Sequence, residues 1–521
     1  MRNLNRRSFM KHTTAIPLGL SAAMPLLGQL PVSVSATAAD TPKAPLNILL
    51  LLTDDQSAHL ECLGTQGIHT PCTTALAEEG VLFVNAFATA ASCAPARSGL
   101  LTGMAPHSNG HWRNTNAPRI NSPDVDFTRQ GRFARIEQVG VHEDIPTLVE
   151  ILNARGYETA ITEKLHLSPP WKYPFRQRFR AGLEVDDNER AAARFFRGCG
   201  DKPFFLMANI LHPHRPFRRH IVKTDYSPVD PNRIDVPANL PDTPDIRRDL
   251  ADYFETVQSA DACAAAILKA LKASGKYDNT LIIFTSDQGY CYHRAKATAY
   301  DLGIRVPLIM AGPTVRKNHF SRQLVSHIDL MPTILDMLSL SIPGTVEGKS
   351  LRPLLSDGQN APWRDIVFAE HNSHGPSPHE YYPIRSAFDG RFHYLRNLLY
   401  DQKRWTGDME SLLKNDTFPN ELLFAGPTDA FQRRSWDNRS FEATIRAKEQ
   451  FPDQYALLQK TFARPHEELY DLHTDPFEMR NLADDERFKK QLLVLRQAVT
   501  QWMKDTNDPG IELNRTPRRT S

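Results

Sequence analysis

The chain has 521 residues, more than a single hydrophobic core usually holds, so we expect one large domain and a smaller one. Lysine and arginine number 62 and aspartate and glutamate 60, and the net charge of +2 gives no argument for a nucleic-acid partner. Hydrophobic residues make up 41% of the chain, as in ordinary soluble globular proteins, which excludes a largely disordered chain.

The first residues carry the pattern of an export signal. Arg6-Arg7 precedes a mildly apolar run, Ala15–Leu30, and small residues follow at Ala36-Thr37-Ala38. This order is typical of twin-arginine export, and the prolines within the apolar run make it a poor membrane span. We therefore expect residues 1–39 to be removed, the export machinery to be a partner, and the mature protein to be periplasmic or secreted.

Short apolar runs alternate with helical patterns over residues 40–360, the predicted catalytic domain. The runs predict buried strands, and they are Leu46–Thr53, Val81–Ala88, Tyr157–Thr162, Phe204–Leu211, Leu281–Thr285 and Leu308–Ala311. Helical patterns cover Ile145–Ala154 and Asp249–Ser274, and a further helix is expected to open at Cys93. The alternation predicts an α/β fold, with a largely parallel sheet flanked by helices on both faces.

Residues 361–521 are predicted to form a smaller α+β subdomain. Glycine, proline and polar residues around Gly344–Pro362 mark its boundary. Two strand patterns, Ile384–Phe388 and Arg391–Leu395, flank Asp389-Gly390, which is a strong hairpin signal. A terminal helix is expected at Arg487–Asp505. We expect an antiparallel sheet with a packed helix.

Polar residues follow the ends of the predicted strands, where the ligand crevice of such a sheet lies. They are Asp54-Asp55, Lys164 and His166, His214, and Asp287-Gln288. An aspartate pair alone is often a helix cap or turn, but this pair follows a buried strand and is matched by Asp287. Carboxylate and amide oxygens are hard ligands that suit Ca²⁺ better than zinc.

The segment Cys93-Ala94-Pro95-Ala96-Arg97 is the most informative motif. Proline fits the first turn of a helix, where free backbone N–H groups and the helix dipole favour an anion. Arg97 lies one turn beyond Cys93 and is expected to face the same anion bidentately. Taken alone, the motif is also compatible with an ordinary buried thiol at a helix start.

This motif, with Leu100-Leu101-Thr102-Gly103 behind it, resembles the signature of the type I sulfatase family. Further matches occur in order along the chain: Asp54-Asp55, Lys164-Leu165-His166, Pro213-His214-Arg215-Pro216, Ser286-Asp287-Gln288-Gly289 and Lys296. The resemblance implies an alkaline-phosphatase-like fold. It also implies that a formylglycine-generating enzyme oxidises Cys93 to Cα-formylglycine (3-oxoalanine).

The resemblance further implies a role for each residue. Ca²⁺ would be held by Asp54, Asp55, Asp287, Gln288 and the modified residue 93. Arg97, Lys164 and Lys296 would neutralise sulfate oxygens, and His166 would contact a hydroxyl of the hydrated aldehyde. His214 would protonate the leaving atom, with His212 as the competing choice. Gln288 departs from the family, because asparagine or histidine is more usual there, and Ala96 replaces a common serine.

The second half of the chain resembles the heparan N-sulfatase (sulfamidase) branch, in Tyr382–Ser386, Arg396–Leu398 and Phe477–Leu482. This implies N-sulfoglucosamine in a sulfated glycan as the substrate. Uronate or sulfate groups would be contacted by Arg385 and by a histidine-rich loop, which otherwise is solvated surface; its histidines are His371, His374 and His379. Lys296 departs from this branch, so an O-sulfatase acting on another sulfated polysaccharide stays open.

Two other classes of function stay open. A phosphomonoesterase or phosphodiesterase on the same fold would carry serine or threonine at position 93 and two zinc ions, so Cys93 argues against it. A non-catalytic glycan-binding protein would keep Cys93 unmodified. The other five cysteines are expected to be buried thiols, with a Cys62–Cys72 disulfide as the alternative. A homodimer is also left open.

Overall fold

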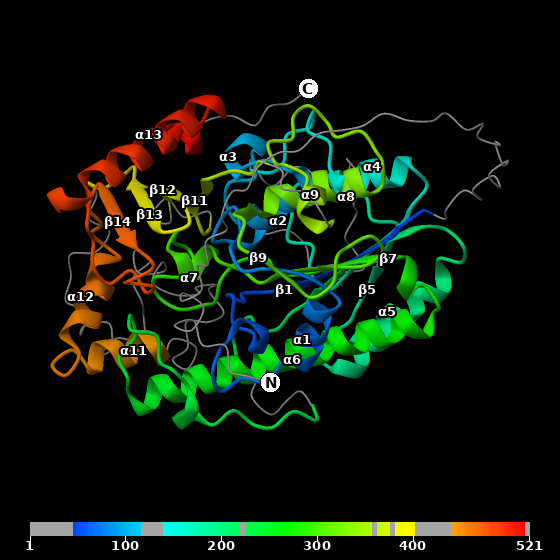
Figure 1. The fold of residues 1–521 in the computed structure, drawn as a ribbon, viewed down its shortest axis with the longest axis horizontal. Helices are drawn as coiled ribbons and strands as arrows, with labels where there is room; N and C mark the ends of the chain where they lie inside the picture. The colour runs from blue at the N-terminus through cyan, green and yellow to red at the C-terminus, as the bar shows by residue number, and fades with distance from the viewer. Residues whose placement is uncertain are drawn as a thin grey trace, which may run out of the picture.

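A computed structural model describes residues 45–115, 139–217, 224–356, 362–375, 381–401 and 439–515. A large sheet with helices on both faces forms the main body, and a smaller four-stranded sheet lies at one end of it (Figure 1). The predicted export signal lies outside these residues. Within the described ranges, no helix combines the length and apolarity needed to cross a membrane.

The large sheet has eight strands in the order β5-β4-β6-β1-β7-β8-β2-β9. In chain order they are β1 (Asn47–Thr53), β2 (Gly80–Phe83), β4 (Glu158–Thr162), β5 (Gln177–Phe179), β6 (Phe204–Ile210), β7 (Thr280–Ser286), β8 (Leu308–Ala311) and β9 (His319–Ser321). Only β8 runs antiparallel to its neighbours in this sheet. Thr53 pairs with Ile210 on one side and Ser286 on the other, so three central strands end together.

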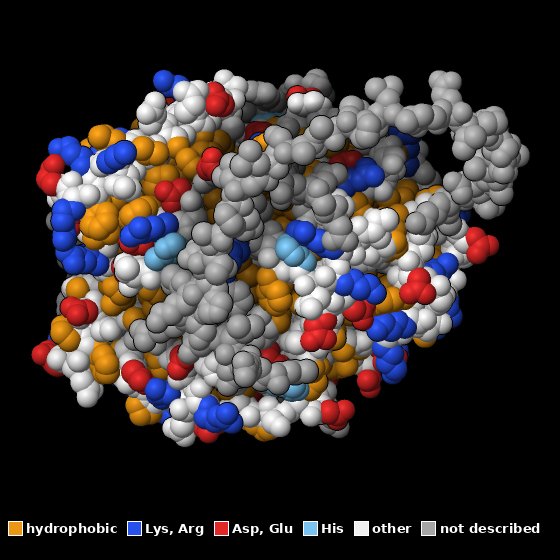
Figure 2. Space-filling model, viewed as in Figure 1, with side chains coloured by type: hydrophobic (Ala, Val, Ile, Leu, Met, Phe, Trp, Pro, Cys, Tyr) orange, Lys and Arg blue, Asp and Glu red, His pale blue; other side chains and the backbone are white. Residues whose placement is uncertain are grey.

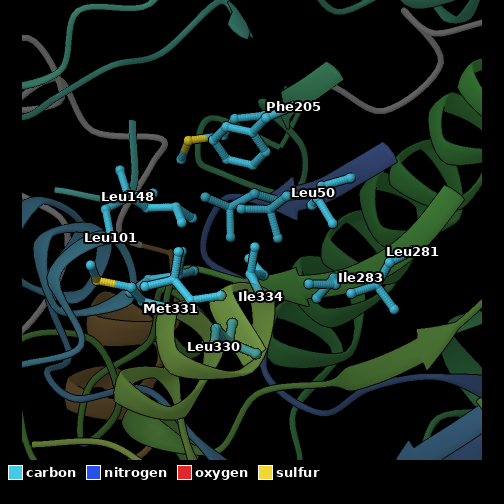
Figure 3. Close-up of a cluster of buried hydrophobic side chains, with 14 of the residues drawn as sticks. Leu50, Leu101, Leu148, Phe205, Leu281, Ile283, Leu330, Met331 and Ile334 are labelled. Carbon is cyan, nitrogen blue, oxygen red and sulfur yellow. The ribbon is translucent and has the colours of Figure 1, made fainter. Parts of the chain in front are cut away.

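Helices cover the two faces because successive residues of β1 point to opposite sides. Leu50 packs among α2 (Cys93–Thr102), α4 (Leu148–Ala154), α8 (Leu330–Met337) and α9 (Arg352–Leu355), and Figure 3 shows this core. Leu49 and Leu51 pack against α1 (Pro71–Glu78), α5 (Val185–Gly198) and α6 (Pro244–Ala273) on the other face. Truncating a core leucine such as Leu50 to alanine is expected to cost about 2–5 kcal/mol.

The predicted fold class is confirmed, although several element bounds differ from the predicted ones. The run Val81–Ala88 splits into β2 and β3 (Ala86–Phe87), and β3 pairs with β10 (Val325–Ser326) in a separate ribbon. The break coincides with a contact far along the chain, since Arg305 donates to the Val84 carbonyl and the Asn85 side chain.

Helix capping moves two other bounds. Thr147 forms a capping box with Glu150, so α4 begins at Leu148 rather than at Ile145. Thr243 accepts from the Ile246 N–H, with proline at the first position, so α6 begins five residues before Asp249. Cys62 and Cys72 are free thiols, so the alternative of a disulfide between them is wrong.

The smaller sheet is antiparallel, with the order β11-β12-β13-β14. Its strands are β11 (Val367–Ser373), β12 (Tyr381–Phe388), β13 (Phe392–Asn397) and β14 (Glu467–Asp471). The predicted hairpin turns at Gly390, whose φ of 95° favours glycine. The predicted terminal helix is α13 (Lys489–Asp505), which packs three apolar side chains onto this sheet, namely Leu492, Leu495 and Val499.

Four further α-helices lie within the described ranges: α3 (Pro106–Asn109), α7 (Asp301–Ile304), α11 (Arg439–Arg446) and α12 (Pro452–Lys460). α11 returns to the main body, where Ala443 joins an apolar cluster built mainly by α6. The surface in Figure 2 shows basic and acidic side chains interspersed over the face it presents. This distribution accords with the nearly balanced net charge.

Candidate active site

The ends of β1 and β7 bring two acidic segments together. The Asp55 N–H donates to Asp287 Oδ1 at 3.1 Å, and the Asp54 N–H donates to the His212 carbonyl at 3.2 Å. Asp55 has a φ of 64°, an unfavourable value for a non-glycine residue. The three carboxylates, of Asp54, Asp55 and Asp287, are fully buried at this edge of the sheet.

The first residue of α2 lies against these carboxylates. Cys93 Sγ is 3.7 Å from Asp54 Oδ1 and 3.9 Å from Asp55 Oδ1. Burial raises the pKa of the Cys93 thiol to about 12, so it stays protonated at neutral pH. A protonated thiol is a poor nucleophile. The backbone N–H groups at this helix start were expected to be free for an anion. That of Ala94 is not, because it donates to Asn114 Oδ1 at 2.9 Å.

Two lysines neutralise the aspartate pair, the partly exposed Lys164 and the buried Lys296. Lys164 Nζ lies 2.5 Å from Asp54 Oδ2, and Lys296 Nζ lies 2.9 and 2.7 Å from the two oxygens of Asp55. Burial alone would raise the pKa of Asp54, but Lys164 and the other nearby cations hold it well below its usual value. Burial alone would lower the pKa of Lys296, and Asp55 instead holds it well above its usual value.

The third cation, Arg97, is engaged differently from the expectation. Its Nε donates to Asp287 Oδ2 at 2.8 Å and its Nη1 to Asn209 Oδ1 at 2.6 Å. Only Nη2 makes no hydrogen bond within the described structure, and it lies 3.8 Å from Asp54 Oδ2. Arg97 therefore uses Nε to hold the Asp287 carboxylate and Nη1 to bind Asn209, which leaves a single amino group for an anion.

The structure separates the two candidate histidines. His214 Nε2 is 3.4 Å from Lys296 Nζ and 3.7 Å from Asp55 Oδ2, whereas His212 Nε2 bonds to the Leu183 carbonyl. His214, about a quarter exposed, therefore faces the site. His166 Nε2 bonds to the Thr115 carbonyl at 3.1 Å. Burial and then Lys164 hold the pKa of His166 well below its usual value, so its ring is neutral.

The donor set fits a hard divalent cation. Ligand atoms of Asp54, Cys93 and Asp287 lie within 4.8 Å of one another, as do those of Asp54, Asp55 and His214. Burial, followed by the neighbouring Asp54, raises the pKa of Asp287 to about 6, and a cation would relieve this repulsion. Gln288 Nε2 lies 2.7 Å from Asp55 Oδ1, while its buried Oε1 has no partner within the described structure. Half a turn of the amide exchanges the two atoms.

Of the residues predicted to bind the substrate, only some lie at the site within the described structure. Arg385 is fully buried, with Nε and Nη2 bound to the Asp508 carboxylate at 2.5 and 2.9 Å, so its expected contact with a glycan is replaced by an internal ion pair. His371 is buried on β11. His374 reaches the site, because its Nδ1 lies 3.2 Å from Ser92 Oγ, next to Cys93. His379 lies outside the described residues.

Three residues at the site were missed by sequence reasoning: Ser92, Asn114 and Asn209. Asn209 carried a readable signal, because it interrupts an apolar strand near its carboxyl end. It binds Arg97 and is held by Thr162 at 2.8 Å. Asn114 lies between two other polar residues, Arg113 and Thr115, and nothing in its local sequence distinguishes it.

The sheet is largely parallel, has helices on both faces, and carries at its edge a nucleophile position, a buried carboxylate cluster and three cations. This combination defines a hydrolase of the alkaline-phosphatase-like class. Residues 46–340 match the family model described as Sulfatase, so the chain belongs to the sulfatase family. Residues 290–421 match the model described as N-sulphoglucosamine sulphohydrolase, C-terminal. The predicted family and its type of activity, removal of sulfate, are thereby confirmed.

Two relatives cover most of the chain. The human N-sulphoglucosamine sulphohydrolase is 29% identical over 505 residues, which cover 90% of this chain and 91% of that protein. An ulvan-active sulfatase of Formosa agariphila is 26% identical and covers 89% of this chain and 80% of its own length.

Solved structures confirm the fold. One protein, solved with its substrate D-glucosamine-2-N,6-O-disulfate, is 19% identical, has a TM-score of 0.60 and covers 90% of this chain and 100% of its own. A phosphonate monoester hydrolase of Agrobacterium radiobacter is also 19% identical, with a TM-score of 0.61 and coverages of 88% and 96%. Because both identities are low, these likenesses describe architecture rather than substrate.

Proposed function

We propose that this sulfatase removes the sulfate of N-sulfoglucosamine in a sulfated glycan, with residue 93 converted to formylglycine and Ca²⁺ held beside it. One observation carries the proposal: Cys93 Sγ lies within 4 Å of two carboxylates that are each paired with a lysine. The match of residues 290–421 to the C-terminal family model and the 29% identity to the human enzyme support the choice of substrate.

The unmodified thiol does not suit a cysteine hydrolase. Reactive cysteines have a lowered pKa, whereas burial raises that of Cys93 to about 12. When formed, the formylglycine hydrate would supply the attacking hydroxyl, and Ca²⁺ would polarise a sulfate oxygen. The carboxylates of Asp54, Asp55 and Asp287 and the amide of Gln288 are the groups that would hold this ion.

The surrounding side chains would neutralise charge, donate a proton and contact the sugar. Lys164, Lys296 and the free amino group of Arg97 offset charge on the sulfate oxygens. His214 faces Lys296 and Asp55 with Nε2, and it would give its proton to the leaving nitrogen as the S–N bond breaks. His374, whose Nδ1 lies 3.2 Å from Ser92 Oγ, would contact the sugar next to the reacting group.

An O-sulfatase on another sulfated polysaccharide is the second candidate. Lys296 favours it, because the resemblance to the sulfamidase branch is weaker at this position. The ulvan-active sulfatase of Formosa agariphila also spans this chain at an identity close to that of the human enzyme.

The test has two stages. Peptide mass spectrometry of protein from its native host should find an aldehyde at position 93, and an intact thiol would instead indicate a non-catalytic glycan-binding protein. Sulfate release is then measured on N-sulfoglucosamine and on glucosamine 6-O-sulfate. Turnover of the second compound alone would replace N-sulfatase by O-sulfatase.

Location belongs to the same proposal. The twin arginine at residues 6 and 7 and the apolar run behind it support export of a folded, already modified protein to the periplasm or beyond. Fractionation of the host should recover the enzyme outside the cytoplasm. Lysine in place of both arginines should retain it inside.

A further inference from the structure

The residue after the site histidine is a buried arginine with an unusual set of contacts. Arg215 is 3% exposed, and its Nη1 and Nη2 donate to the two oxygens of Asp249, near the start of α6, at 3.0 and 2.5 Å. Its guanidinium carbon also lies close to two aromatic rings, 4.0 Å from the centroid of Phe217 and 4.9 Å from that of Tyr292. The conformation of Arg215 is therefore fixed from several directions.

The backbone of the same residue holds the imidazole of His214. His214 Nδ1 lies 2.5 Å from the Arg215 carbonyl oxygen. Because a carbonyl only accepts hydrogen bonds, Nδ1 carries a hydrogen in both charge states of the ring. The proton that His214 can exchange is therefore on Nε2, the atom that faces Lys296 and Asp55.

Arg215 also reaches the loop that carries Lys296. Its Nε donates to the Cys291 carbonyl at 3.1 Å, and the Lys296 N–H donates to the carbonyl of the adjacent Tyr290 at 3.2 Å. One guanidinium thus links α6, the segment of His214 and the loop of Lys296. Those two side chains meet 3.4 Å apart at the site.

We propose that Arg215, held by Asp249, is a positioning residue that aims His214 Nε2 at the leaving group. The proposal rests on the proposed sulfatase function. A buried ion pair is poor evidence for stability, since apolar residues of similar size often stabilise equally well. Here the guanidinium does what an apolar side chain cannot: it fixes the carbonyl that selects the tautomer and orientation of His214.

A double-mutant cycle tests this proposal, because it separates action through His214 from general damage. Arg215→Met should lower kcat about 10²-fold in the His214 background, the usual contribution of a positioned acid, with KM changed less than about threefold. In the His214→Ala background the same change should alter kcat less than about threefold. Equal losses in both backgrounds would overturn the proposal, as would no loss in either.

Asp249→Asn keeps the shape of the side chain that binds Arg215. It should lower kcat in the His214 background, less than Arg215→Met does, and leave kcat nearly unchanged in the His214→Ala background. This variant tests the proposal if Arg215→Met does not fold. Arg305→Met is the matched control. Arg305 is another buried arginine, bound to Asp301 at 2.8 and 2.9 Å and stacked on Phe87 at 4.6 Å. It should change kcat by the same factor in both backgrounds. Absence of wild-type sulfate release would instead refute the proposed function.

Discussion

Two clusters of buried charge differ in how completely their groups are paired. At the site, Arg97 Nη2 and Gln288 Oε1 have no hydrogen bond within the described residues. In the second cluster, where the smaller sheet meets the main body, the four ionisable groups are paired with one another or with neutral partners: His107, Glu370, Arg385 and Asp508. These two unfilled positions lie beside the carboxylates of Asp54 and Asp55, where we expect a ligand to bind.

Cys93→Ala should produce the largest effect. Sulfate release is expected to fall at least about 10⁴-fold, because the attacking group is lost. The free energy of unfolding should change by less than about 1.5 kcal/mol, since one buried sulfur is removed. Ion chromatography of sulfate and urea denaturation measure the two quantities. Cys263→Ala, a buried thiol on α6, should keep its activity, and turnover above one hundredth in Cys93→Ala would contradict the mechanism.

One chemical change in each cluster tests the distinction directly. Asp55→Asn deprives Lys296 of its carboxylate, and Asp508→Asn does the same to Arg385. Each should lower the free energy of unfolding by about 3–5 kcal/mol, because a buried cation loses its shortest ion pair. Only Asp55→Asn should abolish turnover, while kcat per folded molecule stays within about threefold in Asp508→Asn. Equal losses of activity would remove the distinction.

Removal of Ca²⁺ by a chelator should affect only the cluster at the site. Calcium at about one hundred times its dissociation constant would stabilise the folded protein by about 2.7 kcal/mol, so EDTA should lower the melting temperature and added Ca²⁺ restore it. The shift should persist in Asp508→Asn and vanish in Asp55→Asn. Scanning calorimetry measures it, and a shift that survives in Asp55→Asn would place the ion elsewhere.

The paired cluster should show its own pH dependence. Burial alone would lower the pKa of His107, but the Glu370 carboxylate at 2.5 Å raises it above 6.5. The contribution of His107 is therefore complete below pH 6.5 and is lost as the pH rises through the folded-state pKa. The urea midpoint should fall as the solution becomes alkaline, and less so in His107→Gln. His473→Gln, at an exposed position, should leave the slope unchanged.

The smallest effect concerns the cysteines. Cys62 and Cys72 are free thiols, so dithiothreitol should shift the melting temperature of the exported protein by less than about 2 °C. A larger drop, absent in Cys62→Ser, would reveal a disulfide between them.

Much of the fold is readable from sequence because buried parallel strands are continuous apolar runs. Leu308–Ala311 was predicted with its observed bounds, yet nothing local to that run shows that it lies antiparallel to its neighbours. The break in the run Val81–Ala88 coincides with a contact from Arg305, over two hundred residues away. Strand order, direction and such breaks are set by tertiary contacts.

Some residues of the site can also be identified from local motifs, whereas others depend on tertiary contacts. Asp54, Cys93 and Asp287 belong to motifs whose neighbours identify them, and the structure brings them together. Arg385 also lies in a motif, but its partner Asp508 is 123 residues away, and this contact turns a predicted ligand into a buried ion pair. Asn114 acts through one hydrogen bond to Ala94, which only the folded chain reveals.

The loop before Cys93 is joined to the first strand of the smaller sheet. The Glu370 N–H donates to the Thr89 carbonyl at 2.9 Å, Ala90 forms a bridge with Glu370, and His374 meets Ser92. Chimaeras that import a foreign C-terminal portion to alter specificity would cut this join. A graft should therefore include the segment 89–92 together with strand β11, so that the contact between them is kept and Cys93 stays in its position.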